Sequence, residues 1–228
     1  MNEVITTAPN IIPVLTDSAN LWVNIALAIV TLGALLVALF QEKIKARFNR
    51  TRLDMEINLT PPDCHQIDLN DPRGAFICKS LYVRIKISHK NGIAGENIEI
   101  MPVSFSAVSR DGEVNKLDYF LPINLAWSHF QPRTSVMRVP VGLFRHCDFG
   151  HFVKRSDGSP LLILDTMIQP NKVAGGEIPN VIKPGKYVFE LLLSGDNVKP
   201  FIKKWELEFN QWSEDEAQML KNIKIQAV

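Results

Sequence analysis

The residues best suited to chemistry form one short run in the second half of the chain, His146-Cys147-Asp148-Phe149-Gly150-His151. Four of these side chains are possible metal ligands. Successive side chains of a strand point to opposite faces, so His146 and Asp148 should share one face while Cys147 takes the other. A single ion therefore cannot collect all four ligands unless a turn at Gly150 brings His151 back.

A zinc site would also need a second ligand pair from a distant part of the chain, and the nearest such pair is Cys64-His65. A Cys/His nucleophilic pair would need a thiolate beside an imidazole that a third group orients, and the sequence indicates no such arrangement. There is no glycine-rich phosphate loop, Gly-x-Ser-x-Gly elbow or His-Glu-x-x-His motif. We therefore assign no catalytic, cofactor-binding or metal-binding residue. We expect Cys147 to pack inward, the histidines to lie at the surface, and the protein to be neither an enzyme nor a cofactor carrier.

Two further groups of residues are candidates for recognition. Trp127, His129 and Phe130 lie in a proline-flanked segment and Trp212 follows the last predicted strand, and exposed aromatic side chains can form a recognition surface. Tryptophans more often close the ends of a β core, which is the interpretation we favour. Asp196-Asn197 could contact a ligand, but Asp and Asn are also ordinary turn residues.

The segment that must position these groups, residues 53–211, shows the alternation of apolar and polar side chains that is typical of strands with one buried face. The clearest case is a hairpin in which two alternating runs flank a turn at 194–197, namely 187–193 and 205–209. Other strand-like runs cover 53–59, 81–87, 98–108, 136–141 and 161–167, with a long loop at 61–74. We predict a mainly β fold: one N-terminal transmembrane helix, an Ig-like antiparallel β-sandwich and a short C-terminal helix.

Residues 212–228 should form that C-terminal helix and a tail. The run Ser213-Glu214-Asp215-Glu216 has the spacing of a capping box, in which Ser213 accepts a hydrogen bond from a free backbone N–H and Glu216 reaches back. We expect the helix to end at about Lys221, with Met219 and Leu220 facing the sandwich.

Two segments carry a resemblance to known proteins: RIKISHKNGIAGENIEIM and PGKYVFELLLSGDNVKPFIKKWELEFNQW. They resemble uncharacterised small bacterial proteins that have a single membrane span and a soluble Ig-like β-sandwich domain. An Asn-Gly turn after the second strand and a Pro-Gly-x-Tyr turn before the penultimate strand recur in those proteins. The resemblance extends in layout over residues 20–220; it implies the architecture and supplies no site residues.

Residues 21–40 contain no charged side chain. Twenty helical residues at about 1.5 Å each span about 30 Å, the thickness of the hydrocarbon core of a bilayer. We therefore predict a transmembrane helix over 21–41, preceded by a short outer tail, 1–20. A buried core helix would show a polar stripe, and a signal peptide would have a basic n-region and a small-residue cleavage site, so we favour neither.

Cations flank this span on one side only. Residues 1–20 contain Glu3 and Asp17 and no Lys or Arg, whereas the basic juxtamembrane segment 42–52 contains Lys43, Lys45, Arg47, Arg50 and Arg52. Positive flanks stay in the cytoplasm, so we predict a single-pass protein of the inner (cell) membrane with its N-terminus outside and its β domain, 53–211, inside. The sparse cysteines, Cys64, Cys78 and Cys147, agree with a reducing compartment.

The charge balance bears on the partners. The chain has 25 basic and 24 acidic residues; since residues 1–52 hold five and three of them, residues 53–228 hold 20 and 21. A near-neutral domain argues against nucleic acid as a partner.

The sequence leaves the function open between classes. We expect a membrane-anchored, non-enzymatic binding module that recognises a protein partner or small ligand at the inner membrane. The alternative is a ligand-triggered oligomeric membrane effector whose spans perturb the bilayer. Small residues at Gly33, Ala34 and Ala38 would allow close approach of helices in a homo-oligomer. An enzyme is the least favoured class.

Overall fold

The computed structural model describes residues 15–48, 50–71, 73–173 and 175–228. The chain divides into two units at the end of its long helix, Met1–Phe48 and Asn49–Val228.

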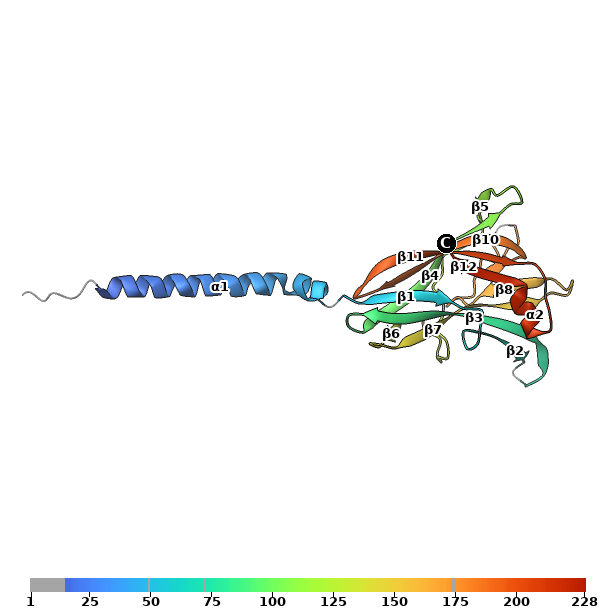
Figure 1. Cartoon of the computed structure of the whole chain (residues 1–228), viewed down its shortest axis with the longest axis horizontal. Helices are drawn as coiled ribbons and strands as arrows, with labels where there is room; N and C mark the ends of the chain where they lie inside the picture. Colours follow the sequence, from blue (N-terminus) through green and yellow to red (C-terminus); the bar gives the residue numbers. More distant parts are fainter. Residues whose placement is uncertain (1–14, 49, 72, 174) are drawn as a thin grey trace, which may run out of the picture. The chain divides into compact units, whose positions relative to one another are not determined.

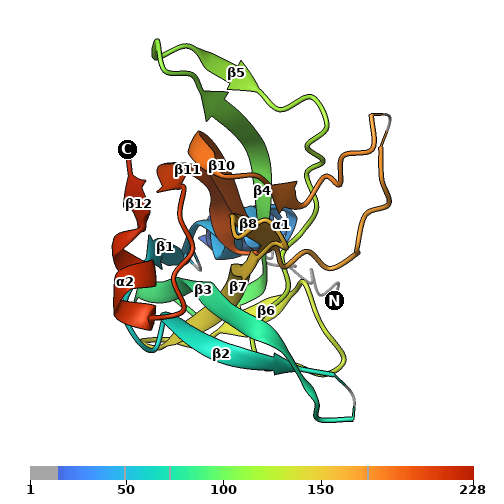
Figure 2. The same ribbon diagram turned by 90° about the vertical axis from the view of Figure 1, so that its right-hand side faces the viewer.

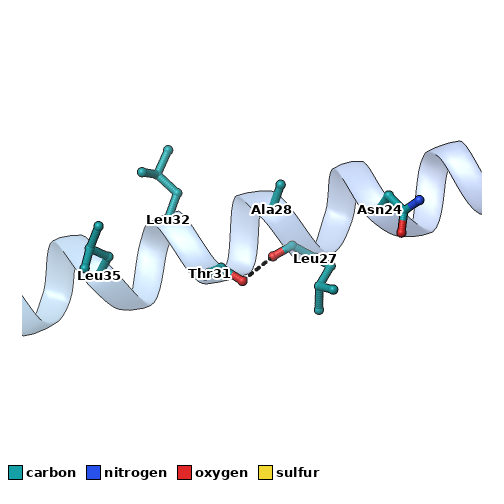
Figure 3. A pocket seen from close by; sticks show the side chains of 6 residues that line it. All are labelled: Asn24, Leu27, Ala28, Thr31, Leu32 and Leu35. Carbon is teal, nitrogen blue, oxygen red and sulfur yellow. Dashed lines mark hydrogen bonds between the residues drawn. The ribbon is translucent and has the colours of Figure 1, made fainter.

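The first unit contains the helix α1 (Leu15–Phe48). Its stretch Asn20–Gln41 is long and apolar enough to cross a membrane, with a mean hydropathy of 2.6 and none of it buried. The lack of buried residues in this stretch disagrees with the alternative of a soluble core helix, because such a helix would pack its apolar side chains against the protein. The Thr31 hydroxyl inside this stretch donates a hydrogen bond to the Leu27 carbonyl oxygen, 2.7 Å away (Figure 3).

The second unit is a sandwich of two antiparallel, six-stranded sheets, which confirms the predicted fold class and is consistent with an Ig-like arrangement (Figures 1 and 2). The first sheet has the order β1-β3-β7-β8-β9, with β2 beside β3. These strands are β1 (Arg52–Ile57), β2 (Cys64–Asn70), β3 (Phe76–Asn91), β7 (Phe144–Lys154), β8 (Pro160–Leu164) and β9 (Val181–Ile182).

The second sheet has the order β12-β11-β10-β4-β5, with β6 beside β4. Its strands are β4 (Gly95–Val108), β5 (Val114–Lys116), β6 (Met137–Val139), β10 (Gly185–Gly195), β11 (Val198–Phe209) and β12 (Ile223–Ala227). The predicted late hairpin is β10 and β11, which pair from Gly185 opposite Phe209 to Gly195 opposite Val198.

Alternation along each strand builds the core between the sheets. In the central parts of β3 and β10, at 81–87 and 187–193, every second residue is buried. Phe189 of β10 lies between Phe105 of β4 and Phe149 of β7, with ring centroids 4.9 and 5.1 Å away. The last of these contacts joins the two sheets, since β7 belongs to the first sheet and β10 to the second.

The C-terminal segment differs from the prediction in two ways. The helix α2 (Glu216–Lys221) is capped by Asp215, whose carboxylate accepts the Gln218 N–H, and not by Ser213. Glu216 does not reach back; it accepts the backbone N–H of Gln66 instead. Met219 is fully buried as expected, but the residues predicted as a tail form β12.

The first sheet also contains a strand that the sequence analysis took for a loop. β2 falls within the predicted loop 61–74. The sequence analysis missed it because its side chains lack the strict alternation of a strand with one buried face. Its pairing with β3 extends the first sheet beyond β1.

Candidate functional site

An irregularity in β7 determines on which face of the sheet the side chains of His146 to His151 lie. The pairing of β3 with β7 shifts register between Val83 opposite Gly150 and Arg84 opposite Asp148, which leaves one extra residue in β7. This bulge changes the phase of the strand, so that His151 joins His146 and Asp148 on the outer face of the sheet. The alternation of His146 and Asp148 is confirmed, but a bulge, not a turn, brings His151 back. A Cβ at position 150 would lie 2.5 Å from the Ile163 carbonyl oxygen, which explains the glycine there.

Opposite them, β3 supplies the matching outer side chains. Tyr82 pairs with His151, Arg84 with Asp148 and Lys86 with His146. Together with residues from two loops they form a polar face on the first sheet, which we define as Asp63, Tyr82, Arg84, Lys86, Ser128, His146, Asp148, His151 and Asp165.

One end of the polar face holds a histidine–carboxylate pair. His146 Nε2 lies 2.7 Å from Asp63 Oδ1, and the side chains are only 15% and 8% exposed. The other carboxylate oxygen, Asp63 Oδ2, accepts a hydrogen bond from the Asn58 amide at 2.8 Å. Both oxygens are therefore occupied, and the imidazole has a fixed orientation.

The middle of the polar face holds an ion pair. Arg84 Nε lies 3.4 Å from Asp148 Oδ1, and the Ser128 hydroxyl donates to the same oxygen. Burial is the largest influence on Asp148 and raises the pKa of its carboxyl; the Ser128 hydrogen bond and the Arg84 charge act in the opposite direction. Arg84 Nε is buried and makes no hydrogen bond with the described residues, so this pair has spare hydrogen-bonding capacity.

The other end repeats the first arrangement. His151 Nδ1 lies 3.2 Å from Asp165 Oδ2, and Arg133 Nη2 lies 3.8 Å from Asp165 Oδ1. The Tyr82 ring stacks on the His151 ring with centroids 5.0 Å apart. Burial, followed by the charges of Asp165 and Asp148, raises the pKa of the Tyr82 phenol.

A cavity of about 270 Å³ opens at the His146 end. It is lined by Ser128, His129, Phe130, Phe144, Arg145 and His146. Phe130 and Phe144 remain 43% and 48% exposed. Lys86 Nζ lies 4.7 Å from the centre of the Phe144 ring, which is the distance of a cation–π contact. The cavity therefore offers aromatic and positively charged groups beside an oriented imidazole.

The cysteines do not belong to this site. Cys147 lies on the inner face, fully buried, and its thiol donates to the Ala126 carbonyl oxygen. Burial raises the pKa of Cys147 well above its ordinary value and that of Cys64 to about 12. A thiolate is disfavoured at both positions, and Cys147 and His146 point to opposite faces, so the structure does not form the Cys/His pair. Cys64 is likewise separated from the polar face, because it pairs with inward-facing Val83.

The arrangement resembles neither a metal centre nor a nucleophilic site. Within the described residues no three His, Cys, Asp or Glu side chains are grouped to hold a metal ion. The two imidazole–carboxylate pairs could exchange protons with a ligand. However, the Ser128 hydroxyl donates to Asp148 and not to an imidazole, so it lacks the geometry of an activated nucleophile.

The other sequence candidates fall into two groups. Trp127 is a core residue, 2% exposed, and its indole N–H donates to the Ile98 and Ser135 carbonyl oxygens. Trp212 is partly buried against the core. His129 and Phe130 are exposed and line the cavity. The Asn197 amide is used inside the fold, since it accepts the Glu96 N–H and donates to Ala94 O.

The sequence analysis missed the partners of the histidines. Asp63 and Asp165 lie 83 and 14 residues from His146 and His151. Only the alternation of Tyr82, Arg84 and Lys86 on the outer face of a strand was visible as a signal.

Comparisons with protein-family models, with curated proteins and with solved structures find no match for this chain. The resemblance to small bacterial single-span proteins therefore stays a prediction.

Proposed function

We propose that this protein is a membrane-anchored, non-enzymatic binding module whose β-sandwich recognises a protein partner or small ligand at the cavity beside His146. The helix α1 would hold the sandwich at the inner membrane. The basic segment that follows the span supports a cytoplasmic location for the sandwich.

One observation carries this proposal: exposed aromatic rings stand beside an almost fully buried imidazole–carboxylate pair. Phe130 and Phe144 are about half exposed, while Asp63 and His146 beside them are nearly covered. Binding sites concentrate their energy in aromatic side chains that surround a few oriented polar groups. The sandwich does not need this arrangement on the outer face of its first sheet in order to fold.

Site-directed photocrosslinking in native membranes tests the site. A benzophenone amino acid replaces Phe130, and the matched control replaces Val114 of β5, which is 57% exposed. We expect a discrete adduct, of protein or small-ligand mass, from position 130 that is absent from position 114. His146→Ala should abolish it. Equal adducts from both positions, or none from position 130, would contradict the proposal.

Paired reporter fusions test the orientation. We expect a C-terminal green fluorescent protein to fluoresce and a C-terminal alkaline phosphatase to be inactive, because the first folds in the cytoplasm and the second outside it. The reverse pattern would place the sandwich outside the cell.

The oligomeric effector is the second candidate, and two polar side chains within the apolar stretch of α1 favour it. These are Asn24 and Thr31, both labelled in Figure 3. Asn24, Thr31 and Ala38 are seven residues apart, which is the spacing of one seam position in a pair of supercoiled helices. Asn24 has no side-chain hydrogen bond within the described part of the chain, and a second copy would supply one inside the bilayer.

This seam shares Ala38 with the small residues named in the sequence analysis, but it does not include Gly33. At 3.6 residues per turn, Gly33 lies about 180° around the helix from Asn24. Native mass spectrometry of the full chain in mild detergent separates the two candidates. Oligomers that Asn24→Leu disperses and Gly33→Leu preserves would favour the effector, whereas a monomer under all conditions would defeat it.

A further inference from the structure

Two turns of the sandwich expose large apolar side chains at one end of the strands. Ile93, in the turn from β3 to β4, is 41% exposed, and Val141 and Leu143, before β7, are 60% and 54% exposed. We call these three residues the entry patch. They lie outside the polar face and the cavity described above.

The second of these turns has a defined geometry. The Leu143 N–H donates to the Pro140 carbonyl oxygen at 3.2 Å, and Gly142 has a φ of 69°. A residue with a side chain rarely adopts this conformation, so the glycine permits the tight turn that exposes Val141 and Leu143.

His89 joins the two turns. Its Nδ1 accepts the Gly142 N–H at 3.2 Å and its Nε2 lies 2.9 Å from the Ile93 carbonyl oxygen. Its backbone N–H donates to the Leu143 carbonyl oxygen at 2.9 Å. His89 therefore joins the two turns of the entry patch through its side chain and its backbone N–H.

This surface surrounds the point at which the chain enters the sandwich. The Thr51 hydroxyl donates to the Ile93 carbonyl oxygen at 2.7 Å, and the Thr51 N–H donates to Asn197 O at 3.0 Å. Nine residues lie between Thr51 and Gln41, the last residue of the stretch that is apolar enough to cross a membrane. Even fully extended, the ten steps from Gln41 to Thr51 reach at most about 36 Å. If α1 crosses a bilayer, as proposed, this connection limits how far this end of the sandwich can lie from it.

Positive charge accompanies the apolar side chains. Arg50 and Arg145, neighbours in sequence of Thr51 and Phe144, are exposed. Neither makes an ion pair with the residues that the structure describes. Apolar side chains flanked by free cations suit the boundary between lipid headgroups and acyl chains, where anionic lipid attracts the cations.

We propose that the entry patch docks on the same bilayer that α1 crosses, with Ile93, Val141 and Leu143 in contact with lipid. The proposal rests on the proposed membrane anchoring. Docking places the His146 cavity beside the lipid surface, because Phe144 follows Leu143 and lines that cavity.

Environment-sensitive labels test the docking on the full chain. In a Cys78→Ser background, Val141→Cys or, as the control, Val114→Cys carries a nitrobenzoxadiazole label. The remaining thiols, Cys64 and Cys147, are buried and resist labelling. Val114 is similarly exposed but pairs with Val108, at the other end of β4 from Ile93. The protein is reconstituted into vesicles of three parts phosphatidylcholine to one part phosphatidylglycerol, with or without doxyl-labelled lipid.

We expect doxyl lipid to remove about half of the emission at position 141 and almost none at position 114, since only a group near the acyl chains meets the quencher. A label at Leu143→Cys repeats the measurement should the first variant fold poorly. Equal quenching at positions 141 and 114 would overturn the docking. Extraction of the protein by alkaline carbonate would show that the membrane anchoring itself has failed, which distinguishes the two outcomes.

Discussion

The two faces of β3 and β7 use alternate residues of the same strands for opposite purposes. The inner face is entirely apolar at Val83, Ile85, Cys147 and Phe149, all fully buried. The outer face carries Arg84, His146, Asp148 and His151, each paired with an opposite charge or a carboxylate. Apolar burial supplies most of the stability of a fold, so the inner face stabilises the sandwich, whereas the proposed function assigns recognition to the outer face.

The largest effect should come from the inner face. Ile85→Ala removes a fully buried side chain and should lower the free energy of unfolding by about 3 kcal/mol, because it leaves a cavity. Denaturant titration measures this. Lys86→Ala, one residue away on the outer face, is the control and should cost less than about 1 kcal/mol. Equal losses would remove the distinction between the faces.

Gly150→Ala should break the arrangement of the outer face. The new methyl group would lie 2.5 Å from Ile163 O, so β7 must shift or lose its bulge, at a cost of about 2 kcal/mol. Nuclear magnetic resonance of the histidine side chains should show a changed His151 signal and a smaller change at His146. An unchanged His151 signal would mean that the bulge tolerates a side chain.

The pH dependence of stability should reveal the partly buried carboxyl of Asp148. Its pKa is raised from the ordinary 3.8, so the folded state retains this proton to higher pH than the unfolded state. The stability of the wild type relative to Asp148→Asn should therefore be constant below pH 3.8 and fall as the pH rises through the folded-state pKa. A relative stability that rises over this window would show that Arg84 and Ser128 outweigh burial.

The smallest effect on stability should come from the cavity. Phe130→Ala removes an exposed ring and should change the free energy of unfolding by less than about 0.5 kcal/mol. Capture of the proposed binding partner should nevertheless fall sharply. A large loss of stability would show that Phe130 is a structural residue.

Local pattern predicted much of this fold. The hairpin of β10 and β11 was visible because Tyr187, Phe189 and Leu191 alternate cleanly with polar residues. β12 was missed because Ile223 to Ala227 pairs with β11, a contact that local sequence does not encode. The cap at Asp215 instead of Ser213 reflects a shift of two residues in the start of a short helix, within the usual uncertainty of helix boundaries.

The site was less predictable than the fold, for a physical reason. Strand alternation correctly placed His146 and Asp148 on one face. It could not reveal the bulge that adds His151, because that bulge depends on the register of β7 against β3. Nor could it find Asp63, which reaches His146 across 83 residues of chain.

The central claim is that the cavity of the outer face binds a partner and is not needed for folding. It is tested most directly by quantitative capture with the full chain from native membranes in mild detergent, comparing wild type with the double variant Phe130→Ala/His146→Ala. We predict that the double variant keeps its Tm within about 4 °C and loses the major captured component by about tenfold or more. An unchanged set and amount of captured components, at an unchanged Tm, would contradict the claim.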